Sequence, residues 1–168
     1  MPTLVLSPHE SRKSRPEATL KLLEKPPLWR AVLAVMMAVL ALVGFWPSPV
    51  DAPAQGGIDS ALAFLHAHGI PGWINYSFVE KSANVALFIP FGAATSLAYP
   101  EKRWWQNAAL GLAVSGCMEL GQLLFLHNRF SSWVDVVTNS GGSLIGVLLA
   151  VAAVHSYQQK QAQRFNQR

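Results

Sequence analysis

The sequence predicts an all-α protein: an integral membrane four-helix bundle with both termini in the cytoplasm and a short amphipathic helix in the first external loop. Three observations predict this fold class. The 168 residues are 51% hydrophobic and only 13% charged, whereas soluble domains carry about 25% charged residues. Four apolar stretches approach or reach the length of about 20 residues that a bilayer requires. Basic residues also cluster in alternate connections between these stretches, which places them on one side of the membrane.

The elements follow in order along the chain. Residues 1–27 are basic and rich in proline, which predicts a disordered cytoplasmic tail. A transmembrane domain at 28–156 then contains predicted spans at 29–46, 81–98, 106–126 and 133–154. Pro90 interrupts the second span and is expected to kink it. Residues 157–168 form a second, Gln-rich cytoplasmic tail.

The distribution of positive charge predicts the orientation. Lys102 and Arg103 occupy the second loop, and further basic residues precede the first span and follow the fourth. The first loop instead carries Asp51, Asp59 and Glu80. The positive-inside rule therefore places both termini in the cytoplasm. No basic surface is left for nucleic acid, so we expect the basic tails to contact membrane lipids.

The long first loop contains one segment with helical periodicity. Ile58, Leu62 and Leu65 share one side of 58–68, which predicts a short amphipathic helix on the outer face. A rival interpretation makes the first apolar stretch a signal peptide that is cleaved at the small residues of 52–54. The apolar core ends well before that point, so we favour a retained span.

Polar side chains within the last three spans, and in the loop between the last two, converge on one end of the bundle. In chain order, they are Asn84, Glu119, Gln122, Arg129, Asp135 and Asn139. An ionisable group at membrane depth costs roughly 3 kcal/mol unless it faces the bundle interior or a wet cavity. We therefore predict a ligand-binding pocket, open to the outside, that is lined by these six pocket residues.

Small residues on the same helix faces predict close packing. Gly142 and Gly146 form a G-x-x-x-G pattern on the face that carries Asn139, and Gly92 shares the face of Asn84. A purely structural interpretation treats the polar residues as interhelical hydrogen bonds that fix helix register. Such bonds contribute only about 0.6 kcal/mol each, which does not account well for two carboxylates.

The chemistry that these residues support is limited. Glu119 and Asp135 form a carboxylate pair of the kind used in acid–base catalysis, and they are the candidate catalytic residues of an enzyme alternative. No nucleophile has a partnered base, and no glycine-rich phosphate loop occurs. His66, His68 and His127 lack a recognised ligand spacing, so we expect neither a metal nor a cofactor.

The motifs resemble those of the VanZ-like membrane proteins. The resemblance covers about 75–155 and is carried by Asn84 with the LFIPFG run that ends at Gly92, by Glu119-x-x-Gln122, and by Arg129, Asp135, Asn139, Gly142 and Gly146 in that order and spacing. It implies a small multi-pass protein of the bacterial cytoplasmic membrane and cell envelope. The founding member is associated with low-level resistance to the glycopeptide teicoplanin, so antibiotic resistance is a role suggested by resemblance alone. Where many members have a further acidic residue, this chain has Ser132.

We therefore expect an envelope protein that binds an amphiphilic ligand, such as a lipid-linked wall precursor or a lipophilic glycopeptide. Arg129 and the three amides of the pocket residues would contact its polar head. Two alternatives stay open. One is an acid–base enzyme that acts on a lipid-linked envelope substrate through Glu119 and Asp135, and the other is a structural partner in a membrane complex. The sequence leaves the oligomeric state open.

Overall fold

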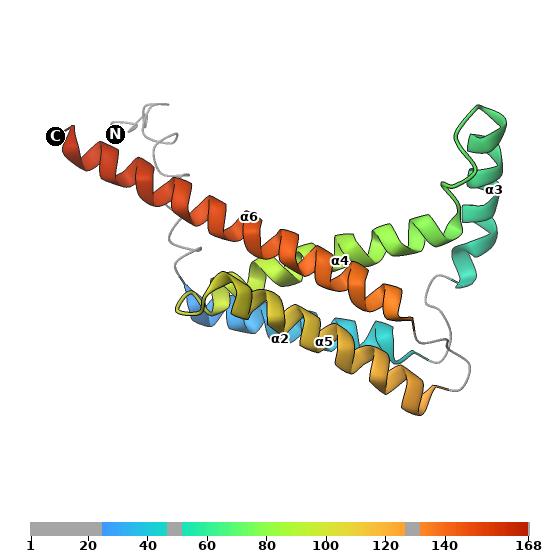
Figure 1. Cartoon of the computed structure of the whole chain (residues 1–168), viewed down its shortest axis with the longest axis horizontal. Coiled ribbons are helices and arrows are strands. Elements are labelled where there is room, and N and C mark those ends of the chain that lie inside the picture. Colours follow the sequence, from blue (N-terminus) through green and yellow to red (C-terminus); the bar gives the residue numbers. More distant parts are fainter. Residues whose placement is uncertain (1–24, 47–51, 127–131, 168) are drawn as a thin grey trace, which may run out of the picture.

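The computed structural model describes residues 25–46, 52–126 and 132–167. Its elements are α2 (Pro26–Gly44), the 3-10 turn η1 (Ala52–Ala54), α3 (Gln55–Ala67), α4 (Tyr76–Ala98), α5 (Trp104–Phe125) and α6 (Trp133–Asn166). No strand occurs in these three ranges, so the all-α prediction is confirmed. Figure 1 shows that α2, α4, α5 and α6 share one long axis, while α3 lies across one end of them. Most of the predicted tail at 1–27 falls outside the described residues.

Three helices are long and apolar enough to cross a membrane: α2, α5 and α6 as far as Arg164. The helix α4 is not among them, although its 23 residues extend about 35 Å, which exceeds a hydrocarbon core of about 30 Å. It contacts α2, α5 and α6. A helix enclosed by other helices tolerates more polar residues because it contacts little lipid. The fourth span, and a kink at Pro90, stay predictions.

The helix α5 buries small and polar residues and exposes large apolar ones. Its buried residues are Asn107, Gly111, Ser115, Glu119 and Gln122. Its exposed residues include Leu112, Leu120, Leu123, Leu124 and Phe125. A surface helix of a water-soluble protein has the opposite distribution. This arrangement suits a helix whose outer surface contacts lipid and whose polar groups are satisfied within the protein.

The apolar core joins α2 to α4. It consists of Leu33, Leu40, Phe88, Phe91, Ala94 and Ala98. At one end of this core, Arg30 Nε donates a hydrogen bond of 3.1 Å to Ala98 O, and its guanidinium carbon lies 5.3 Å from the centre of the Tyr99 ring. A cation near the C-terminal carbonyls of a helix is favoured by the helix dipole. The start of α2 thus lies beside the end of α4, so the two helices are antiparallel.

The helices α4 and α6 approach each other along glycines. A Cβ atom added at Gly92, Gly142 or Gly146 would lie only 1.9–2.3 Å from a backbone oxygen of the facing helix. Such distances are far below van der Waals contact, so each of these three positions requires glycine. The glycines of the predicted packing face therefore lie where α6 meets α4.

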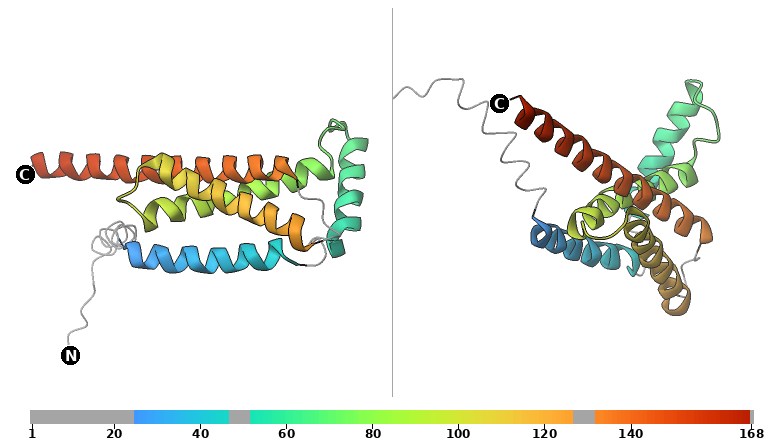
Figure 2. Two further views of the ribbon diagram at one scale, coloured as in Figure 1. Left: turned by 60° about the horizontal axis from the view of Figure 1, so that its bottom comes forward. Right: turned by 60° about the vertical axis from the view of Figure 1, so that its left-hand side comes forward.

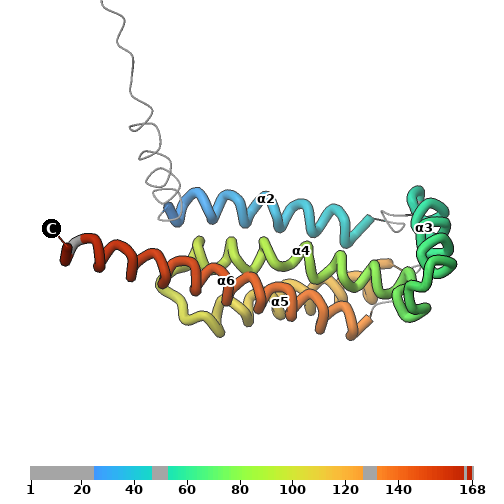
Figure 3. Tube along the Cα trace, turned by 90° about the horizontal axis from the view of Figure 1, so that it is seen from above, coloured from blue at the N-terminus to red at the C-terminus, as the bar shows by residue number. Residues whose placement is uncertain are grey.

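The helix α6 extends well beyond the predicted span at 133–154, and only part of the predicted apolar side of α3 is buried. The helix α6 has 34 residues, or about 51 Å, and it includes most of the predicted tail at 157–168. Its C-terminal turns project beyond the other helices, as Figure 2 shows. In α3, Leu62 is buried and Ile58 half-buried, whereas Leu65 is exposed. Figure 3 shows α3 lying across the ends of α2 and α4.

Candidate functional site

Four helix termini meet at the end of the molecule that α3 crosses (Figure 1): the ends of α2 and α5 and the starts of α4 and α6. Here we call it the α3 end. Each of the five pocket residues that the structure describes belongs to one of the terminal regions at this end. Arg129, the sixth, lies outside the described residues.

The starts of α4 and α6 are joined by Asn84 and Asp135. Asn84 Nδ2 donates a hydrogen bond of 3.4 Å to Asp135 Oδ1, and both side chains are half-buried. Ordinary N–H···O bonds measure 2.7–3.2 Å, so this contact is long. Among the described residues, the carboxylate therefore keeps most of its capacity to accept hydrogen bonds.

Glu119 reaches from α5 to the first turn of α6. Its side chain is 8% exposed, and Oε2 accepts a hydrogen bond of 2.8 Å from Ser132 N. Ser132 Oγ in turn accepts one of 3.2 Å from Val134 N, as the N-cap of a helix does. In a capping box the third residue after the cap would bond to the cap N–H. Here the third residue after the cap is Asp135, but the acceptor for the N–H of Ser132 is Glu119, which belongs to α5.

Both carboxylates thus lie at the N-terminus of α6, where the helix dipole favours negative charge. The main chain connects them, because Asp135 N donates to Ser132 O at 2.9 Å. Glu119 contacts the cap of α6, whereas Asp135 contacts α4.

Asn139 lies one turn further along α6 and points to α5. Its Nδ2 donates a hydrogen bond of 3.1 Å to Ser115 Oγ. Its Oδ1 is buried and has no hydrogen-bond partner within the described part of the chain. This oxygen is therefore an unused acceptor within a polar contact between α5 and α6.

Gln122 turns to a different neighbour. Its Nε2 donates a hydrogen bond of 2.9 Å to Gly44 O at the end of α2. That carbonyl belongs to the last turn of α2, where carbonyls lack intrahelical partners. Gln122 therefore caps α2, although the sequence places it on the same helix face as Glu119.

The pocket residues predicted from sequence include neither Ser115 nor Ser132, yet both bond directly to pocket residues. Two signals could have indicated them. Ser115 precedes Glu119 by one helical turn on the same face. Ser132 and Asp135 have the S-x-x-D spacing of a capping box.

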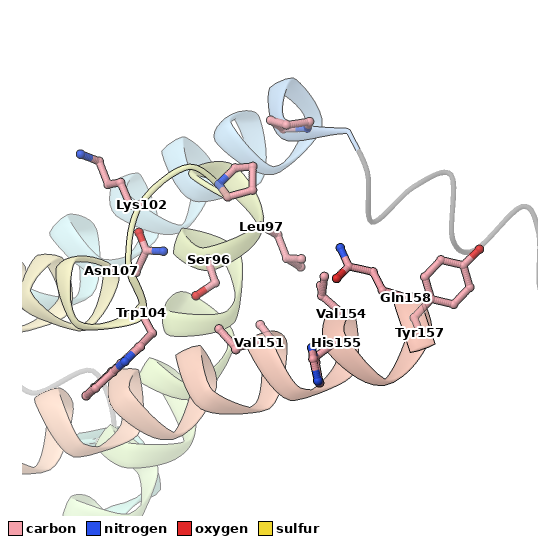
Figure 4. A pocket seen from close by; sticks show the side chains of 13 residues that line it. Ser96, Leu97, Lys102, Trp104, Asn107, Val151, Val154, His155, Tyr157 and Gln158 are labelled. Carbon is pink, nitrogen blue, oxygen red and sulfur yellow. The ribbon is translucent and has the colours of Figure 1, made fainter. Parts of the chain in front are cut away.

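Two of the cavities that described residues line lie elsewhere. One, of about 550 Å³, lies where the end of α4 and the start of α5 face α6, and it is drawn in Figure 4. The other, of about 340 Å³, is an apolar hollow between α2 and α5. None of the five described pocket residues lines either cavity. Among the described residues, no group of three or more His, Cys, Asp or Glu side chains could hold a metal ion.

Apolar exteriors on α2, α5 and α6, combined with polar contacts between helices in the interior, define a helical membrane protein. The family model of VanZ/LLP1 matches residues 32–154, which is more than half of the chain. The chain belongs to the VanZ/LLP1 family, and the resemblance found in its motifs is confirmed. The match begins within α2, so it includes most of the first apolar stretch, which the motifs did not cover. Comparisons with curated proteins and with solved structures gave no match.

Proposed function

We propose that this protein crosses the bacterial cytoplasmic membrane four times, with both termini inside, and binds an amphiphilic envelope ligand at its α3 end. The contact between Asn84 and Asp135 carries the proposal. Within the described residues, the half-buried carboxylate of Asp135 has one side-chain hydrogen bond, which is long. Such a carboxylate is costly within a membrane protein unless another group satisfies it. A ligand with hydrogen-bond donors would supply that group.

The free acceptors favour a head group rich in hydroxyl or amide donors. Asp135 has unused acceptor capacity, and Asn139 Oδ1 is buried without a partner among the described residues. The two residues are four apart on α6, so their side chains lie on one face, one turn from each other. Sugar and peptide head groups carry the matching donors, as in lipid-linked wall precursors and glycopeptides. In this proposal Arg129 adds a cation for an acidic group of the same ligand.

We favour binding over catalysis because of Glu119. An acid–base pair must direct both carboxylates at one substrate. Glu119 Oε2 instead accepts the N–H of the α6 cap, whereas Asp135 contacts α4. This separation of partners supports a structural role for Glu119 and a ligand-binding role for Asp135.

The test uses Asp135→Asn in the purified full-length protein in lipid nanodiscs. The change removes the charge and preserves shape, so a charge-assisted hydrogen bond to the ligand of about 1.5–3 kcal/mol becomes a neutral one of about 0.5–1.5 kcal/mol. We expect the Kd for a lipid-linked wall precursor to rise about tenfold, with the protein level in membranes unchanged. Val137→Ala is the matched control, because Val137 lies on the same helix and is exposed.

Three outcomes decide between the alternatives. Equal affinity of the wild-type protein and Asp135→Asn for both the precursor and a lipophilic glycopeptide would contradict the proposal. Loss of the variant from the membrane would assign the residue to architecture, as the structural alternative holds. Turnover of the precursor that stops in Glu119→Gln would favour the enzyme.

A further inference from the structure

The cavity of about 550 Å³ lies at the opposite end of the molecule from α3. The last turns of α4, the turn that follows, the start of α5 and the C-terminal half of α6 form its walls. Figure 4 shows Ser96 and Leu97 of α4 directed toward Val151 and Val154 of α6. Together with Pro26 of α2, residues from four helices therefore surround a space that none of the five described pocket residues lines.

Two buried polar side chains that line this cavity have unused hydrogen-bonding atoms. Asn107 is 2% exposed and Ser96 is 8% exposed. Asn107 Nδ2 donates to Tyr99 O at 3.4 Å. Because that carbonyl can only accept, the contact fixes the orientation of the amide. Asn107 Oδ1 and Ser96 Oγ have no hydrogen-bond partner in the described ranges.

These two atoms define what a ligand must offer. A buried polar atom without a partner is unfavourable, so both atoms are stabilised when a ligand pairs with them. Asn107 Oδ1 needs a donor such as a hydroxyl group. Ser96 Oγ can donate to an ester or phosphate oxygen.

The cavity changes from apolar to polar along α6. Ala150, Val151 and Val154 line it first, and His155 and Gln158 follow. Because α6 is longer than the hydrocarbon core, its projecting end reaches the membrane–water interface. Trp104, on the rim of the cavity, is a residue type that is enriched at this interface. This gradient matches an amphiphile whose chains run toward the membrane interior.

The charges at the rim are mainly basic. Lys102 borders the cavity, and its flexible side chain is exposed. Lys25 immediately precedes Pro26, which also lines the cavity. Lysines near a membrane surface attract anionic head groups.

We propose that this cavity binds one anionic phospholipid with hydroxyl groups on its head, the chemistry of phosphatidylglycerol. Its phosphate lies within reach of Lys102, a head-group hydroxyl donates to Asn107 Oδ1, and an acyl chain lies along Leu97 and Val154. The site is separate from the α3 end, so this proposal does not depend on the ligand proposed there.

Native mass spectrometry of the full chain in detergent tests this site by titration with phosphatidylglycerol or phosphatidylcholine. We expect phosphatidylglycerol to bind at one site and more tightly. Lys102→Gln should weaken its binding about fivefold, as expected for one lysine near a membrane surface. Lys160→Gln is the matched control, because it removes the same charge from an exposed position on α6 outside the cavity.

Two further variants address the cavity itself. Asn107→Leu removes the amide, and Val151→Phe fills the space from a position that is 42% exposed and therefore tolerant of substitution. Both should reduce phosphatidylglycerol binding. The proposal is wrong if both lipids bind equally, if Lys160→Gln weakens binding as much as Lys102→Gln, or if Val151→Phe leaves binding unchanged. Displacement of the lipid by equimolar glycerol phosphate would assign the site to a soluble phosphate instead.

Discussion

At the scale of single residues, the contact between α4 and α6 depends on glycines, which have no side chain to separate the two backbones. The nearest backbone oxygen lies 1.9 Å from the place that a Cβ of Gly146 would occupy. Gly141, five residues earlier on the same helix, has nothing within 4 Å of that place. Both glycines lie within the helix α6, but a Cβ would meet the facing backbone at Gly146 and open space at Gly141. The two positions therefore form a matched pair for an experiment.

We expect Gly146→Ala to lower the free energy of unfolding by about 1–3 kcal/mol, because overpacking forces the backbones of α4 and α6 apart. Gly141→Ala should leave stability unchanged or raise it by up to about 1 kcal/mol, because alanine is the better helix former. Far-UV circular dichroism during unfolding in mixed micelles measures both. Equal stabilities of the two variants would mean that the helices are not closely packed at Gly146.

At the scale of elements, the start of α6 is held by a neighbouring helix. Glu119 on α5 accepts the N–H of Ser132, and Ser132 Oγ accepts the N–H of Val134. The first N–H groups of a helix lack intrahelical partners, and at membrane depth water supplies few replacements. The contact between α5 and α6 is therefore also the N-terminal cap of α6.

Glu119→Leu should reduce stability by about 1–3 kcal/mol, the cost of leaving the half-buried N–H of Ser132 without its acceptor. Glu119→Gln retains an oxygen acceptor, so its loss should be smaller. Hydrogen exchange of the amides in the first turn of α6 measures the effect locally, and it should accelerate more in the leucine variant. If both variants exchange at the wild-type rate, Glu119 does not act as the cap.

At the scale of the whole molecule, the distribution of residues is that of a membrane protein. The exposed surface of α5 and α6 is rich in leucine and valine, while serine, asparagine and glutamate side chains lie between the helices. The number of spans depends on α4, whose hydropathy is too low for it to be one of the three candidate spans. Whether α4 crosses the membrane decides whether the two termini share a side.

A pair of fusions tests this topology. With four spans, a reporter that works only in the cytoplasm should be active when fused before Met1 and also after Arg168. With three spans, one of the two fusions would be inactive. The positive-inside distribution favours two active fusions, and an inactive reporter after Arg168 would overturn the orientation. A fusion at Gly72, between α3 and α4, provides a further check. If α2 crosses the membrane from a cytoplasmic N-terminus, this fusion should be inactive whether the protein has three spans or four.

The sequence by itself determined the helices and their faces. Apolar runs, glycine spacing and the periodicity of polar side chains are local signals, since each arises within one helix. They indicated the all-α class, the glycine face on α6 and the convergence of Asn84 with Asp135. The order and spacing of its motifs also indicated membership of the VanZ/LLP1 family, which the family match confirms.

The tertiary structure alone decided which neighbour each face meets. Glu119 and Gln122 share a face of α5, yet one caps α6 and the other caps α2, because the edges of a single helical face contact different helices. The cavity beside Ser96 and Asn107 could not be predicted from sequence either, because its lining residues come from four helices and no local pattern joins them. Periodicity within a helix fixes the direction of a side chain, but packing between helices that are distant in sequence fixes what that side chain touches.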